Sequence, residues 1–244
     1  MAKMIIGFDY RVTLEDMEFA AFQDPNRSRG DLITLFREHV GRNRPGRTTQ
    51  ESTATIMLNI WHGRSGETEA VSHLRMRARS LLTETEARQR RALHWGMALL
   101  VYPFFRHFAK QVGLALQLDR EVLAERINRK IKRIYGERRK VEVASKAVIS
   151  SMREWGALKM VRHGVYVPTE RLAIDHPDLR LWLAEVLIYA SEAEMVPLDV
   201  INRSPELFPF SVNLSIPDLR ASERLEVDRQ GLDLIMVGCR ERIG

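Results

Sequence analysis

The chain has 244 residues, of which 45% are hydrophobic and 29% charged, with a net charge of +6 and a pI near 9.7. This composition is typical of a folded globular protein with a substantial core, and it excludes low-complexity and collagen-like chains. The only cysteine, Cys239, excludes an intramolecular disulfide and any zinc site built on cysteines. Its apolar neighbours indicate a buried structural thiol. The N-terminus lacks the apolar stretch of a signal peptide and no segment is long enough for a membrane span, so we expect a cytoplasmic protein without a membrane partner.

Charge is distributed unevenly along the chain. Residues 1–174 carry 31 basic and 19 acidic residues, whereas residues 175–244 carry 7 arginines and 13 acidic residues. A basic body followed by an acidic end indicates a part that binds a polyanion joined to a part with another role. Uneven surface charge without a function would give the same counts.

Residues 1–115 are expected to form a helical domain. Apolar residues at helical spacing predict helices at about 14–22, 31–40, 49–62, 68–82 and 85–101. Pro103 either interrupts the chain after the last of these or starts the following segment. The short connections favour antiparallel packing in a bundle. A basic turn at 41–46 precedes the third helix, and its Arg42 and Arg44, together with Arg47, either bind phosphates or are solvated. The run that contains Arg75, Arg77 and Arg79 is open to the same two interpretations.

Residues 116–174 have the layout of a winged helix-turn-helix. Asp119 is expected to cap a first helix that ends at Gly136, and the residues predicted on its inner side are Val122, Leu123, Ile127, Ile131 and Ile134. A second helix is expected to begin between Glu142 and Ser145 and to end at Trp155, with Val148, Ile149 and Met152 facing inward. Two short apolar runs then flank residues 162–164 and predict a two-stranded hairpin, the wing.

Three features of this module favour binding of double-stranded DNA. Residues 126–140 contain eight basic side chains and one acidic side chain, and neutralising phosphates releases counterions. The second helix has an outer side of small polar and cationic residues, which suits the major groove. The wing tip carries a cation and a histidine that could contact the backbone or minor groove. The predicted DNA-binding residues are Arg126, Arg129, Lys130, Arg133, Arg138, Arg139, Lys140, Ser145, Lys146, Ser150, Arg153, Arg162 and His163, with Arg42, Arg44 and Arg47 as a second zone. The alternative is a winged helix that contacts RNA or protein, with the basic helix merely solvated.

Residues 175–244 are expected to form a smaller acidic α+β region. An apolar helix is predicted from Leu179 to Ala190, followed by a stretch interrupted by prolines. Three large apolar residues of that stretch either anchor it to the body or dock a partner; they are Leu207, Phe208 and Phe210. Residues 224–238 predict a β-hairpin with a turn at 228–231 and a second strand that includes Leu232, Leu234, Ile235 and Val237. An exposed strand edge here would offer a protein-contact site.

No catalytic signature stands out in the chain. It lacks GxxxxGK[ST], a GxGxxG after a strand, GxSxG and HExxH, so no cofactor, metal or enzymatic activity is predicted. Asp218, Glu226 and Asp228 loosely resemble the acidic cluster of a restriction-type nuclease, but Asp228 stands where that pattern has a lysine. An ion pair or a turn cap is the preferred account of these acids, and a metal-dependent nuclease is the rival.

The order of these motifs also resembles a known family. YPFFRHFAKQV (102–112), followed by the basic helix, by SMREWGALK (151–159) and by GVYVP (164–168), is similar to BrxA, a small DNA-binding component of BREX bacteriophage-exclusion systems. The similarity covers about residues 10–170. It implies a helix-rich, non-enzymatic winged-helix protein of a bacterial defence locus, and it assigns a role to no individual residue.

The sequence therefore predicts a mainly α protein: an N-terminal helical domain (1–115), a winged helix-turn-helix (116–174) and a small α+β part with a β-hairpin (175–244). The predicted function is non-catalytic binding of double-stranded DNA, driven mainly by backbone phosphates, within a multi-component phage-defence assembly. The alternatives are a scaffold subunit that binds a protein or RNA partner, and a metal-dependent DNA nuclease.

Overall fold

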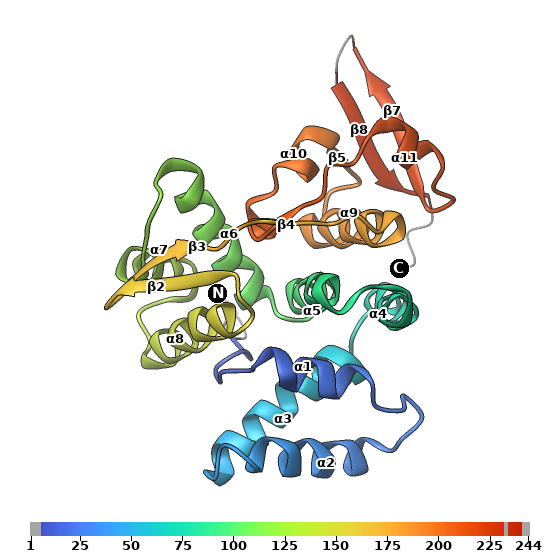
Figure 1. Cartoon of the computed structure of the whole chain (residues 1–244). Helices are drawn as coiled ribbons and strands as arrows, with labels where there is room; N and C mark the ends of the chain where they lie inside the picture. The colour runs from blue at the N-terminus through green and yellow to red at the C-terminus, as the bar shows by residue number, and fades with distance from the viewer. Residues whose placement is uncertain (1–5, 232–233, 241–244) are drawn as a thin grey trace.

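The computed structural model describes residues 6–231 and 234–240, and these residues form a mainly helical protein (Figure 1). Within them lie eleven α-helices, one 3-10 helix and eight strands in three small sheets. The predicted mainly α fold is therefore confirmed, as is a small antiparallel sheet near the C-terminus.

The first six helices follow one another with short connections, as predicted. They are α1 (Leu14–Ala21), α2 (Arg29–Gly41), α3 (Arg47–His62), α4 (Glu69–Glu84), α5 (Ala87–Val101) and α6 (Pro103–Leu118). Their starts depend on capping: Thr13 and Thr68 accept hydrogen bonds from the backbone at the starts of α1 and α4. At α2 the cap is Ser28, not Asp31, because the Ser28 hydroxyl accepts from the Asp31 amide. Pro103 occupies the first turn of α6, where its missing N–H costs no helical hydrogen bond.

The middle of the chain forms a helix pair and a three-stranded sheet. Its elements are β1 (Val122–Leu123), α7 (Ala124–Tyr135), α8 (Arg139–Glu154), β2 (Leu158–Arg162) and β3 (Val165–Pro168), and the antiparallel sheet has the order β1-β3-β2. The prediction that Asp119 caps a helix containing Val122 and Leu123 is wrong. Both residues have extended backbone and pair with β3 instead. Their side chains point to opposite faces of the sheet, so Val122 is buried and Leu123 is exposed.

The C-terminal part combines helices with two small sheets. Its elements are β4 (Leu172–Ala173), α9 (Pro177–Ser191), β5 (Met195–Pro197), α10 (Leu198–Asn202), the 3-10 helix η1 (Pro205–Leu207), β6 (Phe210–Ser211), α11 (Ile216–Arg220), β7 (Leu225–Gln230) and β8 (Leu234–Cys239). The predicted hairpin is present as β7 and β8, although 228–230 belong to β7 rather than to the turn. The predicted strand residue Leu232 lies outside the described residues. The sequence missed β5, which pairs with β8.

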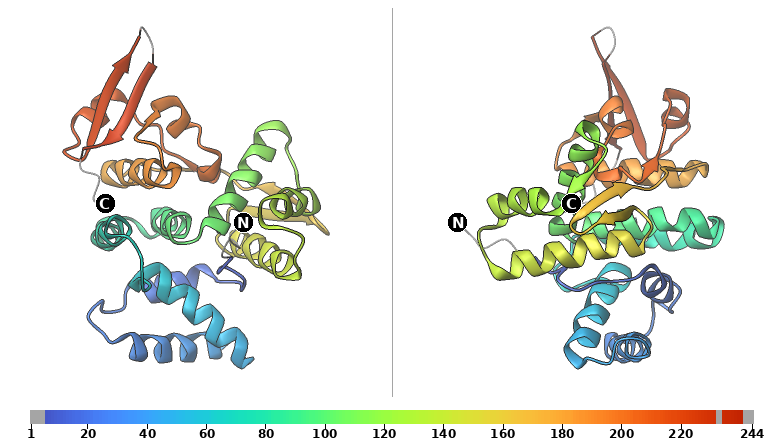
Figure 2. Two further views of the ribbon diagram at one scale, coloured as in Figure 1. Left: turned by 180° about the vertical axis from the view of Figure 1, so that it is seen from behind. Right: turned by 60° about the vertical axis from the view of Figure 1, so that its left-hand side comes forward.

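One hydrophobic core runs through all three parts. Trp95 of α5 lies at its centre, where its ring contacts Trp155, which follows α8, and Phe208 and Phe210 from the C-terminal part. The prediction that Leu207, Phe208 and Phe210 anchor their segment is confirmed, since all three are buried. The core crosses residues 115 and 174 without a break, and α7 and α8 pack beside α6 (Figure 2).

Candidate nucleic-acid interface

Helix α7 presents a row of cations to solvent. Ile127, Ile131 and Tyr135 lie on its buried side, so the side chains between them point outward. Arg129, Lys130 and Arg133 are exposed and form no ion pair with any described residue, whereas Arg126 lies 3.6 Å from Asp119. The predicted inward position of Ile134 is wrong: it is 40% exposed, and Tyr135 takes the buried position.

Several basic residues in and near the turn from α7 to α8 form contacts within the protein. The Arg138 guanidinium donates to the Tyr135 carbonyl at 2.8 Å, which satisfies a carbonyl at the end of α7. Lys140 pairs with Asp9 at 3.1 Å, and Lys132 bridges Glu142 and Glu137, whose hydrogen bonds raise the pKa of Lys132. Arg139 is exposed and unpaired within the described part of the chain.

Helix α8 begins at Arg139, earlier than predicted, and its predicted inner residues Val148, Ile149 and Met152 are buried. Lys146 and Arg153 are exposed and Ser150 is half-buried, so the spacing i, i+4, i+7 places a polar stripe along one side of the helix. Ser145 does not lie on this outer side, because it is 5% exposed. Its hydroxyl is buried and has no hydrogen-bond partner among the described residues.

A groove of about 490 Å³ lies between α7, α8 and the β2–β3 hairpin. Its wall residues come from the start of α7 (Asn128), from α8 (Ser145, Lys146, Arg153) and from the β2–β3 turn (His163). The side-chain oxygens of Asn128 and Ser145 are buried and lack partners among the described residues. Asn128 is a groove residue that the sequence analysis missed; the only available signal was a polar residue among apolar positions of an amphipathic helix.

The predicted two-stranded hairpin is present as β2 and β3, and its turn is bonded to the start of α7. Gly164 has a φ of 73°, a value that favours glycine, and its carbonyl accepts from the Ala124 amide at 2.9 Å. His163 is exposed at the tip, while Arg162 pairs with Glu121 at 3.0 Å on the surface. A backbone hydrogen bond therefore joins the β2–β3 turn to the first residue of α7.

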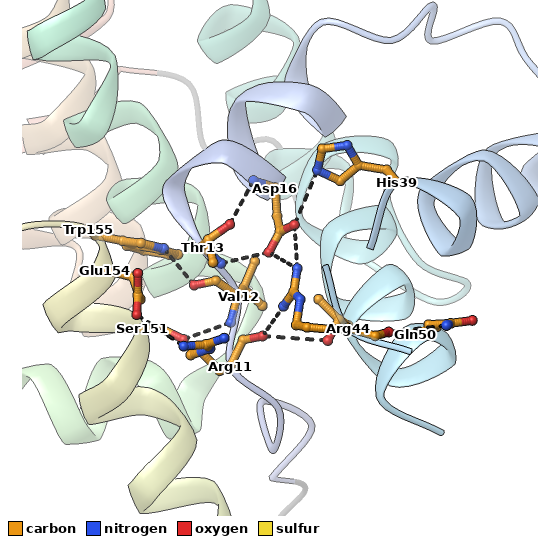
Figure 3. A network of polar contacts seen from close by, with 11 residues as sticks. Arg11, Val12, Thr13, Asp16, His39, Arg44, Gln50, Ser151, Glu154 and Trp155 are labelled. Carbon is orange, nitrogen blue, oxygen red and sulfur yellow. Dashed lines mark hydrogen bonds and ion pairs between the residues drawn. The ribbon is translucent and has the colours of Figure 1, made fainter. Parts of the chain in front are cut away.

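The second basic zone is connected to α8 through a polar network (Figure 3). Arg44 donates to both carboxylate oxygens of buried Asp16 at 2.6 Å and to the Arg11 carbonyl at 3.0 Å. Arg11 in turn pairs with Glu154 at the end of α8. Arg44 is thus occupied inside the protein, and we remove it from the set of candidate DNA contacts. Arg42 and Arg47 are exposed, and Arg47 pairs with Glu51 on α3.

The arginines of α4 are turned inward and belong to the fold. Arg75 pairs with Glu67, Arg77 pairs with Glu185, and Arg79 donates to the backbone carbonyls of Trp61, Ala21 and Gln23. The sequence offered two interpretations of these arginines, phosphate binding and a solvated surface. Neither fits, because their guanidinium groups are held in ion pairs and hydrogen bonds within the protein.

One of the acids that loosely resemble a nuclease cluster, Asp218, has a structural role. Asp218 completes a capping box with Ser215 at the start of α11 and pairs with Arg180 at 3.3 Å. Across residues 6–231 and 234–240, no three histidines, cysteines or acids gather in a way that could hold a metal ion. Nor does any helix in these ranges combine the length and apolarity needed to cross a membrane.

Comparison with known proteins adds no assignment. No family model, no curated protein and no solved structure matches this chain.

Proposed function

We propose that the unit from α6 to β3 is a winged helix-turn-helix and that the protein binds double-stranded DNA without catalysing a reaction. The observation that carries this proposal is a set of six exposed cations that pair with no described residue: Arg129, Lys130, Arg133, Arg139, Lys146 and Arg153. All six lie on α7 and α8, beside a wing, and the strand order β1-β3-β2 suits this kind of module.

In this proposal α8 lies in the major groove. Lys146 and Arg153 would reach acceptor atoms of guanine, with the small Ser150 between them. Arg129, Lys130, Arg133 and Arg139 would neutralise phosphates beside the groove, and His163 at the wing tip would contact the neighbouring backbone. Arg126, Lys140 and Arg162 hold exposed ion pairs of small net value, which phosphates could replace.

The experiment is fluorescence anisotropy of a labelled duplex at several salt concentrations. Four phosphate contacts predict a slope of log K against log salt of about −4, and roughly a hundredfold or greater loss of affinity between about 50 and 200 mM salt. The double variant Arg129→Gln/Arg133→Gln removes two of these phosphate contacts and should reduce the magnitude of the slope by about two units. The matched control, Arg203→Gln/Arg220→Gln, removes two exposed arginines of the C-terminal part and should leave the slope unchanged. Equal effects of the two double variants would refute the placement of the interface.

We propose further that the protein acts in a multi-component bacterial phage-defence assembly. The resemblance of residues 102–168 to BrxA supports this context. Co-purification of partner proteins from a native host, retained after nuclease treatment, would test it.

A scaffold role is the second candidate, because apolar side chains interrupt the basic surface. Ile134 on α7 and Val143 on α8 are 40% and 46% exposed. A protein partner would cover them, whereas a phosphate backbone would not. Ile134→Ser/Val143→Ser should then abolish partner binding and leave the salt slope for DNA intact; the opposite pattern would argue against the scaffold.

A further inference from the structure

A second cavity lies well away from α7 and α8. It has a volume of about 340 Å³, which lies within the range of small-molecule sites, and it opens between α4, α9 and the C-terminal sheet. In Figure 1 these elements are on the opposite side of the molecule from α7 and α8. Its charged and titratable lining includes His73 and Arg77 of α4, Glu185 of α9, and Arg224 and Arg240 at the ends of the β7–β8 hairpin.

An incompletely satisfied ion pair forms one wall of this cavity. Glu185 is 7% exposed and pairs with Arg77 through Oε2. Its other oxygen, Oε1, is buried and accepts no hydrogen bond from any described residue. Burial raises the pKa of Glu185, although Arg77 opposes this effect. Since buried carboxylate oxygens are normally hydrogen-bonded, this wall has the chemistry to accept a donor from a bound molecule.

The lining also contains side chains without described partners, together with a second acid, Glu223. The Arg224 guanidinium and the His73 ring make no hydrogen bond or ion pair with the residues that the structure describes. Both are close enough to Glu185 to lower its pKa. Arg240 donates through Nε to the Leu225 carbonyl at 3.0 Å, which leaves its two terminal nitrogens without a described partner.

We propose that this cavity binds a small organic anion that also carries a hydrogen-bond donor. The anionic group would lie against Arg224 and Arg240, and the donor would lie against Glu185. Leu74 and Ile188 give the cavity an apolar wall for the carbon skeleton. Hydroxy acids and nucleoside monophosphates both have this combination of groups. The proposal is independent of DNA binding, because none of these residues belongs to α7, α8 or the wing.

Cys239 provides a direct reporter, since it lines the cavity and is the only cysteine of the chain. The rate of its alkylation by iodoacetamide would be followed by intact mass, with citrate, adenosine monophosphate or sodium chloride of equal ionic strength. At a ligand concentration about ten times the Kd, alkylation should slow about tenfold relative to chloride. The melting temperature should rise under the same conditions. The two probes separate a hydroxy acid from a nucleotide as the preferred class.

Arg224→Gln is the decisive variant, because its side chain has no described structural partner. It should lose the protection and the melting shift, whereas Arg220→Gln, an exposed arginine of α11 outside the cavity lining, should keep both. The proposal is overturned if neither probe acts at millimolar concentration, or if Arg224→Gln is protected as well as the parent. Should the thiol be unreactive in the free protein, the melting shift alone decides.

Discussion

A substitution of Arg44 tests whether this buried arginine stabilises the fold or binds DNA. Its side chain is 14% exposed, and it donates to both oxygens of Asp16, whose side chain is 3% exposed. Asp16 also accepts from the Thr13 amide at 2.7 Å and lies 3.3 Å from the His39 ring. Arg44→Ala would leave this carboxylate buried without its main cation. Breaking a buried pair in this way costs about 3–5 kcal/mol of unfolding free energy.

Urea unfolding of Arg44→Ala and Arg47→Ala would measure this difference within a single basic turn. Arg47 is 83% exposed and pairs with Glu51, one helical turn away, so its loss should cost less than about 0.5 kcal/mol. A double replacement, Asp16→Leu/Arg44→Met, should recover most of the lost stability, because it removes both charges together. The reasoning is refuted if Arg44→Ala is no less stable than Arg47→Ala while its salt slope for DNA falls, since Arg44 would then be a phosphate contact.

Two further predictions concern packing and pH. A Cβ added at Gly113 would lie 1.9 Å from the Pro205 carbonyl oxygen. Gly113→Ala should therefore lower the free energy of unfolding in urea by about 1–3 kcal/mol or more. The control, Gly30→Ala in the open first turn of α2, should be neutral or stabilising by up to about 1 kcal/mol. Equal effects of the two substitutions would contradict the close approach of α6 and η1. Burial lowers the pKa of His62 from 6.5 to about 4, so the unfolded chain binds this proton first and stability should fall as pH drops from 6.5 towards 4. The urea midpoint should therefore be lower at about pH 5 than at about pH 7, and His62→Gln should lose less over that interval; an identical loss in both proteins would rule out His62 as a cause.

Local pattern was a reliable guide where burial is periodic. The apolar spacing of α8, the extent of α4 and the start of α6 at Pro103 all follow from rules that act within a few residues. The β7–β8 hairpin follows for the same reason, although residues 228–230, expected in the turn, pair as part of β7. The helix prediction for Val122 and Leu123 failed because a strand of two residues is too short to show a hydrophobic period. Only their pairing with β3 identifies them as a strand.

The candidate interface was less predictable than the fold, because the role of a cation depends on what stands opposite it. Arg44 meets Asp16 across 28 residues of chain and Arg77 meets Glu185 across 108, and no local signal announces such partners. Ser145 was expected outside, yet the packing of α8 against α7 and the sheet buries it. The basic residues of α7 were easier to place, since Ile127 and Ile131 fix which side of that helix faces water.

The sequence by itself determined the mainly helical character, the helix pair followed by a hairpin, and the concentration of positive charge before residue 175. These properties follow from hydrophobic period, capping and composition, which act locally or sum over the chain. Tertiary structure decided which arginines are consumed in ion pairs, which polar atoms lack partners, and how Trp95 joins three segments into one core. It decided them because burial and charge pairing depend on residues that only the folded chain brings together.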